Sequence, residues 1–245
     1  MVVHLAGLSH VPTCAKDPEL AFRINRDGTR FVAGELQKVA GDLYGGGVFV
    51  FASTAQVYQA AKGEEAKTEA LFTEDRRIEP QNLYAETKWQ AEEALRGIAK
   101  AGRLELRILR FFNHTHKTQS PDFFLPHIYS QLKAGKTEIP VGNLDIRRDF
   151  GALKDLLAAL EIAVARELPG EVYNVCSGKA KSLRALAEGL AKRMGVQARF
   201  VTDPARVREG EPVSLAGSHE LFTRATGWKP RFADESAFLD AFLSD

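Results

Sequence analysis

The first half of the chain alternates short apolar runs with longer segments of helical periodicity. Apolar runs occupy residues 2–6, 48–51 and 104–109, and helical periodicity covers residues 17–43 and 83–101. The run at 48–51 has no polar alternation, which is typical of a strand covered on both faces. Strands separated by helices pair in parallel through right-handed crossovers. We therefore predict an α/β fold built on a parallel sheet.

The pattern loosens after residue 110. Residues 111–121 are polar and are expected to form a loop, as are residues 59–80. Shorter periodic and apolar segments follow. They predict helices at 123–134, 153–165, 183–194, 218–226 and 233–243, and strands at 137–141, 171–175 and 198–201. We interpret the second half as a smaller α/β lobe that packs on the sheet.

Composition narrows the classes of partner. The 245 residues are 44% hydrophobic, which is enough for one sizeable core. The 33 basic and 32 acidic residues leave a net charge of +1, which indicates neither a nucleic-acid nor a membrane partner. No apolar stretch approaches the ~20 residues that span a bilayer, and the start lacks the basic flank of a signal peptide. Because Cys14 and Cys176 lie far apart without a metal-ligand spacing, we expect a reduced, cytoplasmic protein that holds no metal.

Candidate chemistry lies on the second long helix. Tyr84 and Lys88 are four residues apart and would share one helical face. An ammonium one turn from a phenol favours the phenolate, so we expect Lys88 to lower the pKa of Tyr84 from roughly 10. Thr54, just after an apolar run, would add a neutral hydrogen bond to the same substrate oxygen. These groups suit keto/alcohol redox chemistry. The alternative is a surface tyrosine packed on a lysine stem, since such a pair also arises by chance.

Five segments, in order along the chain, resemble the extended short-chain dehydrogenases/reductases that act on nucleotide sugars. They are Val3-His-Leu-Ala-Gly7, Asn25-Arg-Asp-Gly-Thr29, Ser53-Thr-Ala-Gln-Val-Tyr58, Tyr84-Ala-Glu-Thr-Lys88 and Arg110-Phe-Phe-Asn113. The resemblance implies a Rossmann-type doubly wound sheet, with a cofactor-binding part at 1–115 and a nucleotide-sugar lobe mainly at 116–245. It also implies NAD or NADP as cofactor, in contact with Leu5, Ala6, Gly7, Ala52, Tyr84, Lys88 and Phe112.

Further segments resemble the members of this family that reduce GDP-4-keto-6-deoxy-D-mannose. They are Phe112-Asn-His-Thr115, Gln119-Ser-Pro-Asp-Phe123, Gly142-Asn-Leu-Asp-Ile-Arg-Arg148-Asp-Phe150, Pro169-Gly-Glu-Val-Tyr-Asn-Val-Cys-Ser-Gly178, Asp203-Pro-Ala-Arg206 and Gly227-Trp-Lys-Pro230. The reaction implied is hydride transfer to the C4 carbonyl of the sugar. In that reaction Tyr84 would donate the proton, Lys88 would hold the nicotinamide ribose and Thr54 would orient the carbonyl.

The same resemblance implies a GDP-sugar substrate and residues that bind it. Asn113 would contact the substrate beside the reacting centre. Arg148 and Arg208 are candidates for the diphosphate, because guanidinium groups match phosphate oxygens bidentately. Each has a plainer alternative. Asn113 could cap the helix that follows, Arg148 could pair with Asp149 or Asp155 on the surface, and Arg208 could face solvent.

One part of the family pattern is not found. The family begins with a strand, a Gly-x-x-Gly-x-x-Gly turn and a helix whose N-terminus binds the cofactor pyrophosphate. The glycines at 45–47 precede a strand instead of opening a helix. We therefore expect an N-terminally truncated sheet, through a start codon assigned too late, a truncated gene or a part supplied by a partner. The choice between NAD and NADP then cannot be read from the sequence.

Two other functions stay open. Thr54 is followed by Ala55 and Gln56, whereas 4,6-dehydratases of the family place Asp-Glu after their threonine, which favours reduction or epimerisation. An epimerase would share Thr54, Tyr84 and Lys88 but would keep NAD tightly bound and show no net consumption of it. The third possibility is a catalytically inactive remnant or partner-binding module, motivated by the missing glycine turn.

The resemblance also bears on assembly and on the first long helix. Proteins of this family commonly form homodimers through four helices, and residues 17–43 and 83–101 resemble the pair of helices that each subunit contributes. We therefore expect a homodimer. Asn25 and Thr29 lie on the first of these helices and are expected to support the site and not to react.

Overall fold

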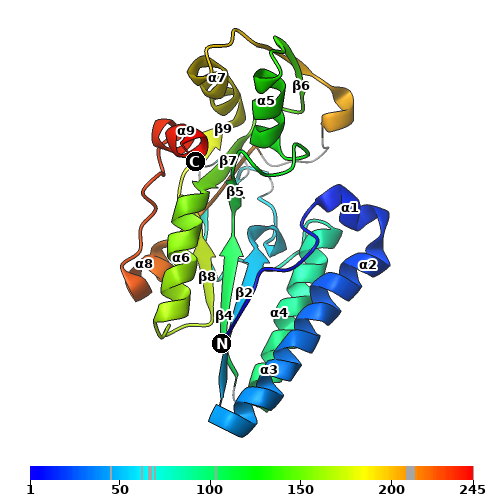
Figure 1. The fold of residues 1–245 in the computed structure, drawn as a ribbon, viewed down its shortest axis with the longest axis vertical. Helices are drawn as coiled ribbons and strands as arrows, with labels where there is room; N and C mark the ends of the chain where they lie inside the picture. The colour runs from blue at the N-terminus through cyan, green and yellow to red at the C-terminus, as the bar shows by residue number, and fades with distance from the viewer. Residues whose placement is uncertain are drawn as a thin grey trace.

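The centre of the molecule is a parallel sheet with helices on both faces (Figure 1). The computed structural model describes residues 1–44, 46–61, 63–65, 68, 70–102, 104–207 and 213–244. The four strands of the central sheet follow the order β1-β2-β4-β8, and every adjacent pair is parallel. The predicted α/β fold with a parallel sheet is confirmed.

The elements alternate along the chain as follows. The strands are β1 (Val2–His4), β2 (Gly47–Thr54), β3 (Leu71–Phe72), β4 (Leu104–Phe111), β5 (Asn113–Thr115), β6 (Glu138–Val141), β7 (Arg147–Ala152), β8 (Val172–Val175), β9 (Ala180–Ser182), β10 (Arg199–Thr202) and β11 (Ser214–Gly217). The α-helices are α1 (Val11–Lys16), α2 (Pro18–Phe22), α3 (Thr29–Tyr44), α4 (Leu83–Ala101), α5 (Phe124–Lys133), α6 (Leu153–Ala165), α7 (Leu183–Arg193), α8 (Glu220–Thr226) and α9 (Glu235–Leu243). A π-helical segment, η1 (Arg23–Gly28), joins α2 to α3, and 3-10 turns lie at η2 (Ala55–Val57) and η4 (Pro204–Arg206).

Apolar side chains on both faces of β2 explain why helices cover the sheet on both sides. Phe49 and Phe51 pack in the cluster beneath α3 and α4, whereas Val50 packs in the cluster beneath α6 and α8. All three side chains are fully buried. A strand buried on both faces needs apolar residues at every position, which is why its sequence shows no polar alternation.

The first long helix is divided into three parts. Asp17 caps α2 by accepting the backbone N–H of Leu20 at 3.0 Å. The π-helical segment η1 then interrupts the α-helical pattern before α3 begins. The expectation of one uninterrupted helix over 17–43 is therefore wrong at this segment. The π-helical segment contains the fully buried Asn25, and π-helical turns are frequent at functional sites.

The second half both completes the central sheet and builds an apolar cluster of its own. Strand β8 and helices α6 and α8 pack on the central sheet. Helices α5, α7 and α9 pack around β6 and β7, at the top of Figure 1. Strand β7 belongs to a sheet ordered β3-β11-β7-β5, in which β9 pairs with β7 in antiparallel fashion. Strand β10 pairs with β6 in parallel.

Several short strands of the second half differ from the sequence-based expectation. Strands β7, β9 and β11 were not predicted, and part of the loop expected at 111–121 forms β5. Strand β7 begins Arg147-Arg148-Asp149, so it presents charges where an apolar run would be needed to recognise it. Strands of this kind form because remote segments pair with them, which local propensity does not report.

Asp149 joins three segments of the second half. Its side chain is fully buried. Oδ1 accepts the N–H and the hydroxyl of Ser177 at 2.8 and 2.6 Å, and Oδ2 accepts the N–H groups of Gly178 and Gly217 at 3.0 and 3.3 Å. Lys181 Nζ donates to Ser177 Oγ at 2.8 Å. One carboxylate thus connects β7 with the turn after β8 and with the end of β11.

Asp149→Asn should lower the free energy of unfolding by about 2–4 kcal/mol, because the amide nitrogen would face backbone N–H groups that lose their acceptor. Asp145→Asn is the matched control, since this aspartate is 77% exposed and pairs with Arg184 on the surface. We expect the control to stay within about 0.5 kcal/mol of the parent. Urea unfolding followed by circular dichroism at pH 7 measures both. Equal stability of the two variants would contradict the connecting role of Asp149.

Candidate functional site

Thr54, Tyr84 and Lys88 meet where the strands of the central sheet end. Thr54 is the last residue of β2, and Tyr84 lies in the first turn of α4. The side chain of Asn82 caps α4 by accepting the N–H of Ala85 at 3.0 Å, which sets the start of the helix. In α/β sheets ligands bind beyond the carboxyl ends of the strands. The structure therefore brings the three candidate proton-transfer groups to the end of the sheet where a ligand is expected.

Burial controls the protonation of Tyr84. It raises the pKa of the Tyr84 phenol to about 12, against a smaller lowering by the hydrogen bond with Thr54. The Cys14 thiol adds to the rise. The expected net lowering of this pKa below 10 is therefore wrong, because removal of the phenol from water outweighs the neighbouring groups. Tyr84 is a neutral phenol at pH 7, which is the form that can donate a proton.

Lys88 lies in an apolar environment. Its side chain is 4% exposed, and Nζ lies 4.1 Å from the centroid of the Phe51 ring. Burial lowers the pKa of Lys88 to about 8, while Glu92, one turn further along α4, opposes this shift. Burial also lowers the pKa of His4, and the charge of Lys88 adds to that effect. Lys88 is therefore charged at pH 7 but close to the pH at which it loses its proton.

The segment that follows β1 passes close to Lys88. A Cβ atom on Gly7 would lie 2.9 Å from Asn25 Oδ1 and 3.9 Å from Lys88 Nζ, so a larger residue would displace Asn25. The Leu5 side chain is 58% exposed, and Ala6 and Gly7 are exposed as well. Leu5, Ala6 and Gly7, which the sequence predicts to contact a cofactor, thus form a solvent-exposed segment after β1. We call this segment the open strand end; its Gly7 lies beside Lys88.

Asn25 ties this segment to α4. It is fully buried, its Oδ1 accepts the N–H of Leu8 at 2.7 Å, and its Nδ2 donates to the Leu8 carbonyl and to Thr87 Oγ1, both at 2.9 Å. The hydroxyl of Thr29 donates to the Asn25 carbonyl at 2.7 Å. Asn25 and Thr29 therefore support the site, as expected from their place on the first helix.

Ala52 and Phe112, two further residues expected to contact the cofactor, differ in how deeply their side chains are buried. Ala52 lies in β2 two residues before Thr54, and it packs half-buried in the cluster beneath α6. Phe112 is 5% exposed, and its ring packs against Cys176 and so close to Gly217 that a Cβ atom there would clash. The Phe112 side chain is thus part of the core.

Asn113 is the first residue of β5 and braces two strands. Its Nδ2 donates to the backbone carbonyl of Asp149 at 3.2 Å, which joins β5 to β7. The alternative that Asn113 caps the following helix is wrong, since Phe123 is the N-cap residue of α5. Asn113 therefore stands at the turn between the central sheet and the second half.

Of the two candidate arginines, the structure describes only Arg148. Arg148 lies in β7, and its Nη1 donates to the carbonyl of Arg147 at 2.8 Å. The carboxylate of Asp149 accepts the hydrogen bonds already described, and that of Asp155 accepts two backbone N–H groups, each at 3.0 Å. Arg208 lies outside the described residues.

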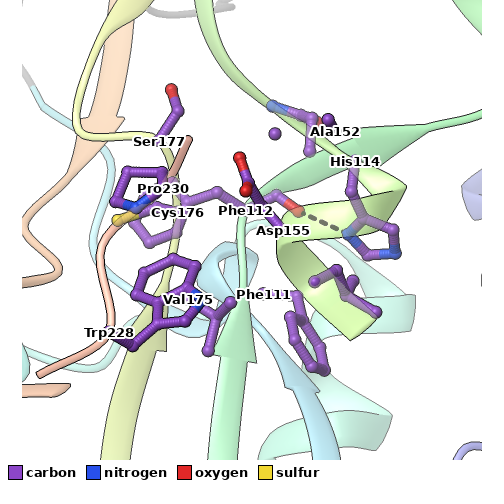
Figure 2. Close-up of a pocket in the computed structure, with 13 residues that line it drawn as sticks. Phe111, Phe112, His114, Ala152, Asp155, Val175, Cys176, Ser177, Trp228 and Pro230 are labelled. Atoms are coloured by element: carbon purple, nitrogen blue, oxygen red, sulfur yellow. Dashed lines mark hydrogen bonds between the residues drawn. The ribbon is translucent and has the colours of Figure 1, made fainter. Parts of the chain in front are cut away.

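A small pocket opens beneath α6, on the face of the sheet opposite to α4 (Figure 2). His114, Asp155 and Trp228 are among the residues that line it. Burial lowers the pKa of His114, whose Nδ1 lies 3.1 Å from the Phe112 carbonyl oxygen. The pocket has room for about one water molecule. Phe112 and Asn113 line it as well, but it is too small for a nucleotide sugar.

Sequence reasoning missed the buried ion pair between Glu92 of α4 and Arg110 of β4. Their side chains are 0% and 3% exposed, and Arg110 Nη2 lies 2.7 Å from Glu92 Oε2. A signal was present, because Glu92 follows Lys88 by four residues on the same helical face. Arg110 is also a charge among the apolar residues Ile108, Leu109 and Phe111 at the end of β4. Opposite charges at such positions indicate a buried pair.

The described residues show neither a metal-binding cluster nor a membrane-spanning helix. Within it, no group of three or more His, Cys, Asp or Glu side chains is arranged to hold a metal ion. None of the helices among the described residues is both long enough and apolar enough to cross a membrane. Cys14 and Cys176 are buried, unbridged thiols.

Comparison with known proteins gives several matches that cover most of the chain. The family model described as GDP-mannose 4,6 dehydratase matches residues 1–238. GDP-6-deoxy-D-mannose reductase of Pseudomonas aeruginosa is 34% identical over 251 aligned positions, which cover 100% of this chain and 79% of that protein. UDP-glucose 4-epimerase of Lactobacillus helveticus is 25% identical, with 94% of this chain and 72% of that protein covered.

A solved structure matches as well. The structure of RMD from Pseudomonas aeruginosa complexed with NADPH is 32% identical and superposes with a TM-score of 0.81, covering 99% of this chain and 80% of that one. The Rossmann-type fold is confirmed by this match. The family model covers almost all of the chain, and its match agrees with the segments that resemble nucleotide-sugar enzymes. The chain belongs to the GDP-mannose 4,6-dehydratase family, within the extended short-chain dehydrogenases/reductases.

Proposed function

We propose that this protein uses NADH or NADPH to reduce the 4-keto group of a GDP-4-keto-6-deoxy-hexose. The observation that carries the proposal is the meeting of Thr54, a neutral Tyr84 and a buried, charged Lys88 at the carboxyl end of the sheet. The identity to a GDP-6-deoxy-D-mannose reductase supports reduction as the reaction. The NADPH in the solved structure of RMD supports the cofactor.

The strand end after β1 fits a nicotinamide cofactor. Leu5 and Ala6 are exposed there, and Gly7 lets the backbone pass closer to Asn25 and Lys88 than a residue with a Cβ atom could. When bound, the cofactor would supply the hydride. We assign residues 1–115 mainly to cofactor binding and residues 116–245 mainly to the nucleotide sugar, in a cytoplasmic enzyme.

Thr54, Tyr84 and Lys88, hereafter the trio, take distinct roles in this reaction. Tyr84 donates its proton to the C4 oxygen of the sugar as that oxygen gains negative charge. Thr54 donates a hydrogen bond to the same oxygen and orients the carbonyl. Lys88 stabilises the phenolate that forms when the proton leaves Tyr84, because an ammonium one turn away favours the charged phenol. The half-buried phenol thus stays protonated until the substrate accepts the proton.

Substrate residues come from both halves of the chain. Asn113 is placed at the turn between them and would contact the sugar. Arg148 and Arg208 are the candidates for the diphosphate. Ala55 and Gln56, which follow Thr54, provide no carboxylate for the acid and base steps of a dehydration. This absence at the strand end favours reduction over dehydration.

Epimerisation is the second candidate function. A UDP-glucose 4-epimerase is 25% identical to this chain over 94% of its length, which is the observation in its favour. An epimerase would return the sugar at the same oxidation level and leave the nicotinamide unchanged overall. The two reactions separate when the chain is mixed with GDP-4-keto-6-deoxy-mannose and NADPH or NADH. A loss of absorbance at the nicotinamide band supports reduction, and an unchanged absorbance contradicts it.

Tyr84→Phe should lower kcat by about 10²–10⁴-fold, because the substrate oxygen loses its proton donor. Binding of NADPH, followed by the fluorescence of the nicotinamide, should be retained. Tyr129→Phe is the matched control, since this tyrosine of α5 packs on Phe242 in the second half and should keep full activity. An active Tyr84→Phe variant would contradict the assigned role.

Lys88→Met should raise the free energy of unfolding at pH 7 by about 1–3 kcal/mol while it removes activity. The folded-state pKa of Lys88, about 8, lies below the ordinary value of 10.5, so the unfolded chain binds the proton more tightly. The charged lysine therefore costs stability below pH 8, and this cost disappears as the pH rises from about 8 to 10.5. Thermal unfolding against pH measures the effect. Lys100→Met, at the exposed end of α4, should give no gain, and a Lys88→Met variant without a gain would contradict the account.

We infer a homodimer that forms through α3 and α4, which lie side by side (Figure 1). Phe31 and Val39 of α3 are 67% and 56% exposed, although they are large apolar side chains. Phe31→Glu should therefore shift the protein toward monomer in sedimentation velocity runs. Leu157→Glu on α6, 48% exposed in the parent, serves as control and should leave the dimer intact. A monomeric parent protein would contradict this assembly.

A further inference from the structure

The carboxylate of Glu92 is completely buried and has four donors around it. Its Oε1 accepts the Ser53 hydroxyl at 2.5 Å and Arg110 Nε at 3.1 Å. Its Oε2 accepts Arg110 Nη2 at 2.7 Å and Arg96 Nη2 at 3.1 Å. These donors come from β2, β4 and the next turn of α4. One side chain therefore connects three elements of the sheet and its covering helix.

These contacts lie next to each group of the candidate site. Ser53 directly precedes Thr54 in β2, and Glu92 lies one turn after Lys88 in α4. Arg110 is three residues before Asn113, with only Phe111 and Phe112 between them. A change in the position of the Glu92 carboxylate would therefore reach all three segments over at most three residues of chain or one helical turn.

Aromatic rings enclose the Arg110 side of the pair. The guanidinium carbon of Arg110 lies 4.8 Å from the centroid of the Tyr58 ring and 6.0 Å from that of Trp89. Such an enclosure removes water from both charges, and desolvation of a buried pair can exceed its Coulombic gain. Well-packed apolar residues often give equal or greater stability at such a place. Stability alone therefore does not explain why a carboxylate stands at this position. The property that apolar residues could not supply is its negative charge.

The charge of Glu92 acts directly on Lys88. The titratable groups that act on Lys88 or respond to its charge are His4 on β1 and Glu92 on α4, and Tyr84 lies one turn before Lys88 on the same helix. Cys14 of α1 acts on Tyr84. Burial favours the neutral form of Lys88, and Glu92 is the group that favours the charged form. Without Glu92, the low-dielectric surroundings would lower the pKa of Lys88 further.

We propose that Glu92 is a positioning residue of this site, which holds the ends of β2, β4 and α4 in one register and places a fixed negative charge one helical turn from Lys88. Its effect on the reaction rests on the proposed function. Its effect on the charge of Lys88 and on the three segments belongs to the folded chain and can be measured without substrate.

The charge of Lys88 can be followed by NMR on protein labelled with ¹³C at the lysine Cε atoms, with the Lys88 signal assigned from its loss in Lys88→Arg. In the parent protein the Lys88 signal should titrate with a midpoint of about 8. In Glu92→Gln the midpoint should fall by on the order of one pH unit. Glu93→Gln, the neighbouring carboxylate with a 54% exposed side chain, is the matched control and should leave the midpoint unchanged.

An unchanged midpoint in a folded Glu92→Gln variant would overturn the electrostatic half of the proposal. If that variant does not fold, Arg96→Gln replaces it, because it removes a cation from Glu92 Oε2 at the rim of the network. The Lys88 midpoint should then rise, and a fall or no change would overturn the same half. Because no turnover is measured, a parent protein without reductase activity leaves this test intact.

Hydrogen exchange tests the positioning half. In Glu92→Gln, amide exchange should become faster at the ends of β2 and β4 together, including Thr54 and Phe111, whereas α9 in the second half should exchange as in the parent. Faster exchange confined to α4 would overturn the positioning half. Glu92→Asp keeps the charge but shortens the side chain, so it should retain the Lys88 midpoint and still loosen both strand ends. A Glu92→Asp variant with a lowered midpoint would contradict the assignment of the shift to charge.

Discussion

The packing of α4 against the carboxyl end of the parallel sheet is the constraint on which the candidate site depends. Ala91 and Leu95 are fully buried against the sheet and fix the rotation of the helix about its axis. Because four residues are about one turn, this rotation sets Tyr84 and Lys88 on the side that faces Thr54. Hydrophobic burial thus fixes the relative positions of these three side chains. Their protonation then depends on how far this packing removes each of them from water.

Three buried polar side chains hold the segments around this packing. Asn25 binds the strand end after β1 to α4, Glu92 binds β2 and β4 to α4, and Asp149 binds the strands of the second half to one another. Buried polar atoms cost free energy unless each has a partner. Among the described residues no buried side-chain nitrogen or oxygen lacks one. Displacement of any one segment would break hydrogen bonds in another, so the open strand end, the trio and Asn113 keep their relative positions.

The sequence predicted the elements with strong local patterns and missed those that depend on remote partners. Helices α4 and α6 have the bounds that their periodicity indicates, Leu83–Ala101 and Leu153–Ala165. Strand β7 could not be recognised, because its charged residues are stabilised by pairing with segments far along the chain. The shift in the pKa of Tyr84 was predicted with the wrong sign for a related reason. Spacing along a helix gives the neighbourhood of Lys88, but the extent of burial is a property of the whole fold.

The fate of the hydride tests the central claim most directly. The protein is mixed with GDP-4-keto-6-deoxy-mannose and NADPH that carries deuterium at both C4 positions of the nicotinamide, and the mass of the product sugar is measured. The account predicts one deuterium in each product molecule and one NADPH oxidised for each sugar reduced. A product sugar without deuterium, formed while the NADPH stays unchanged, would contradict it.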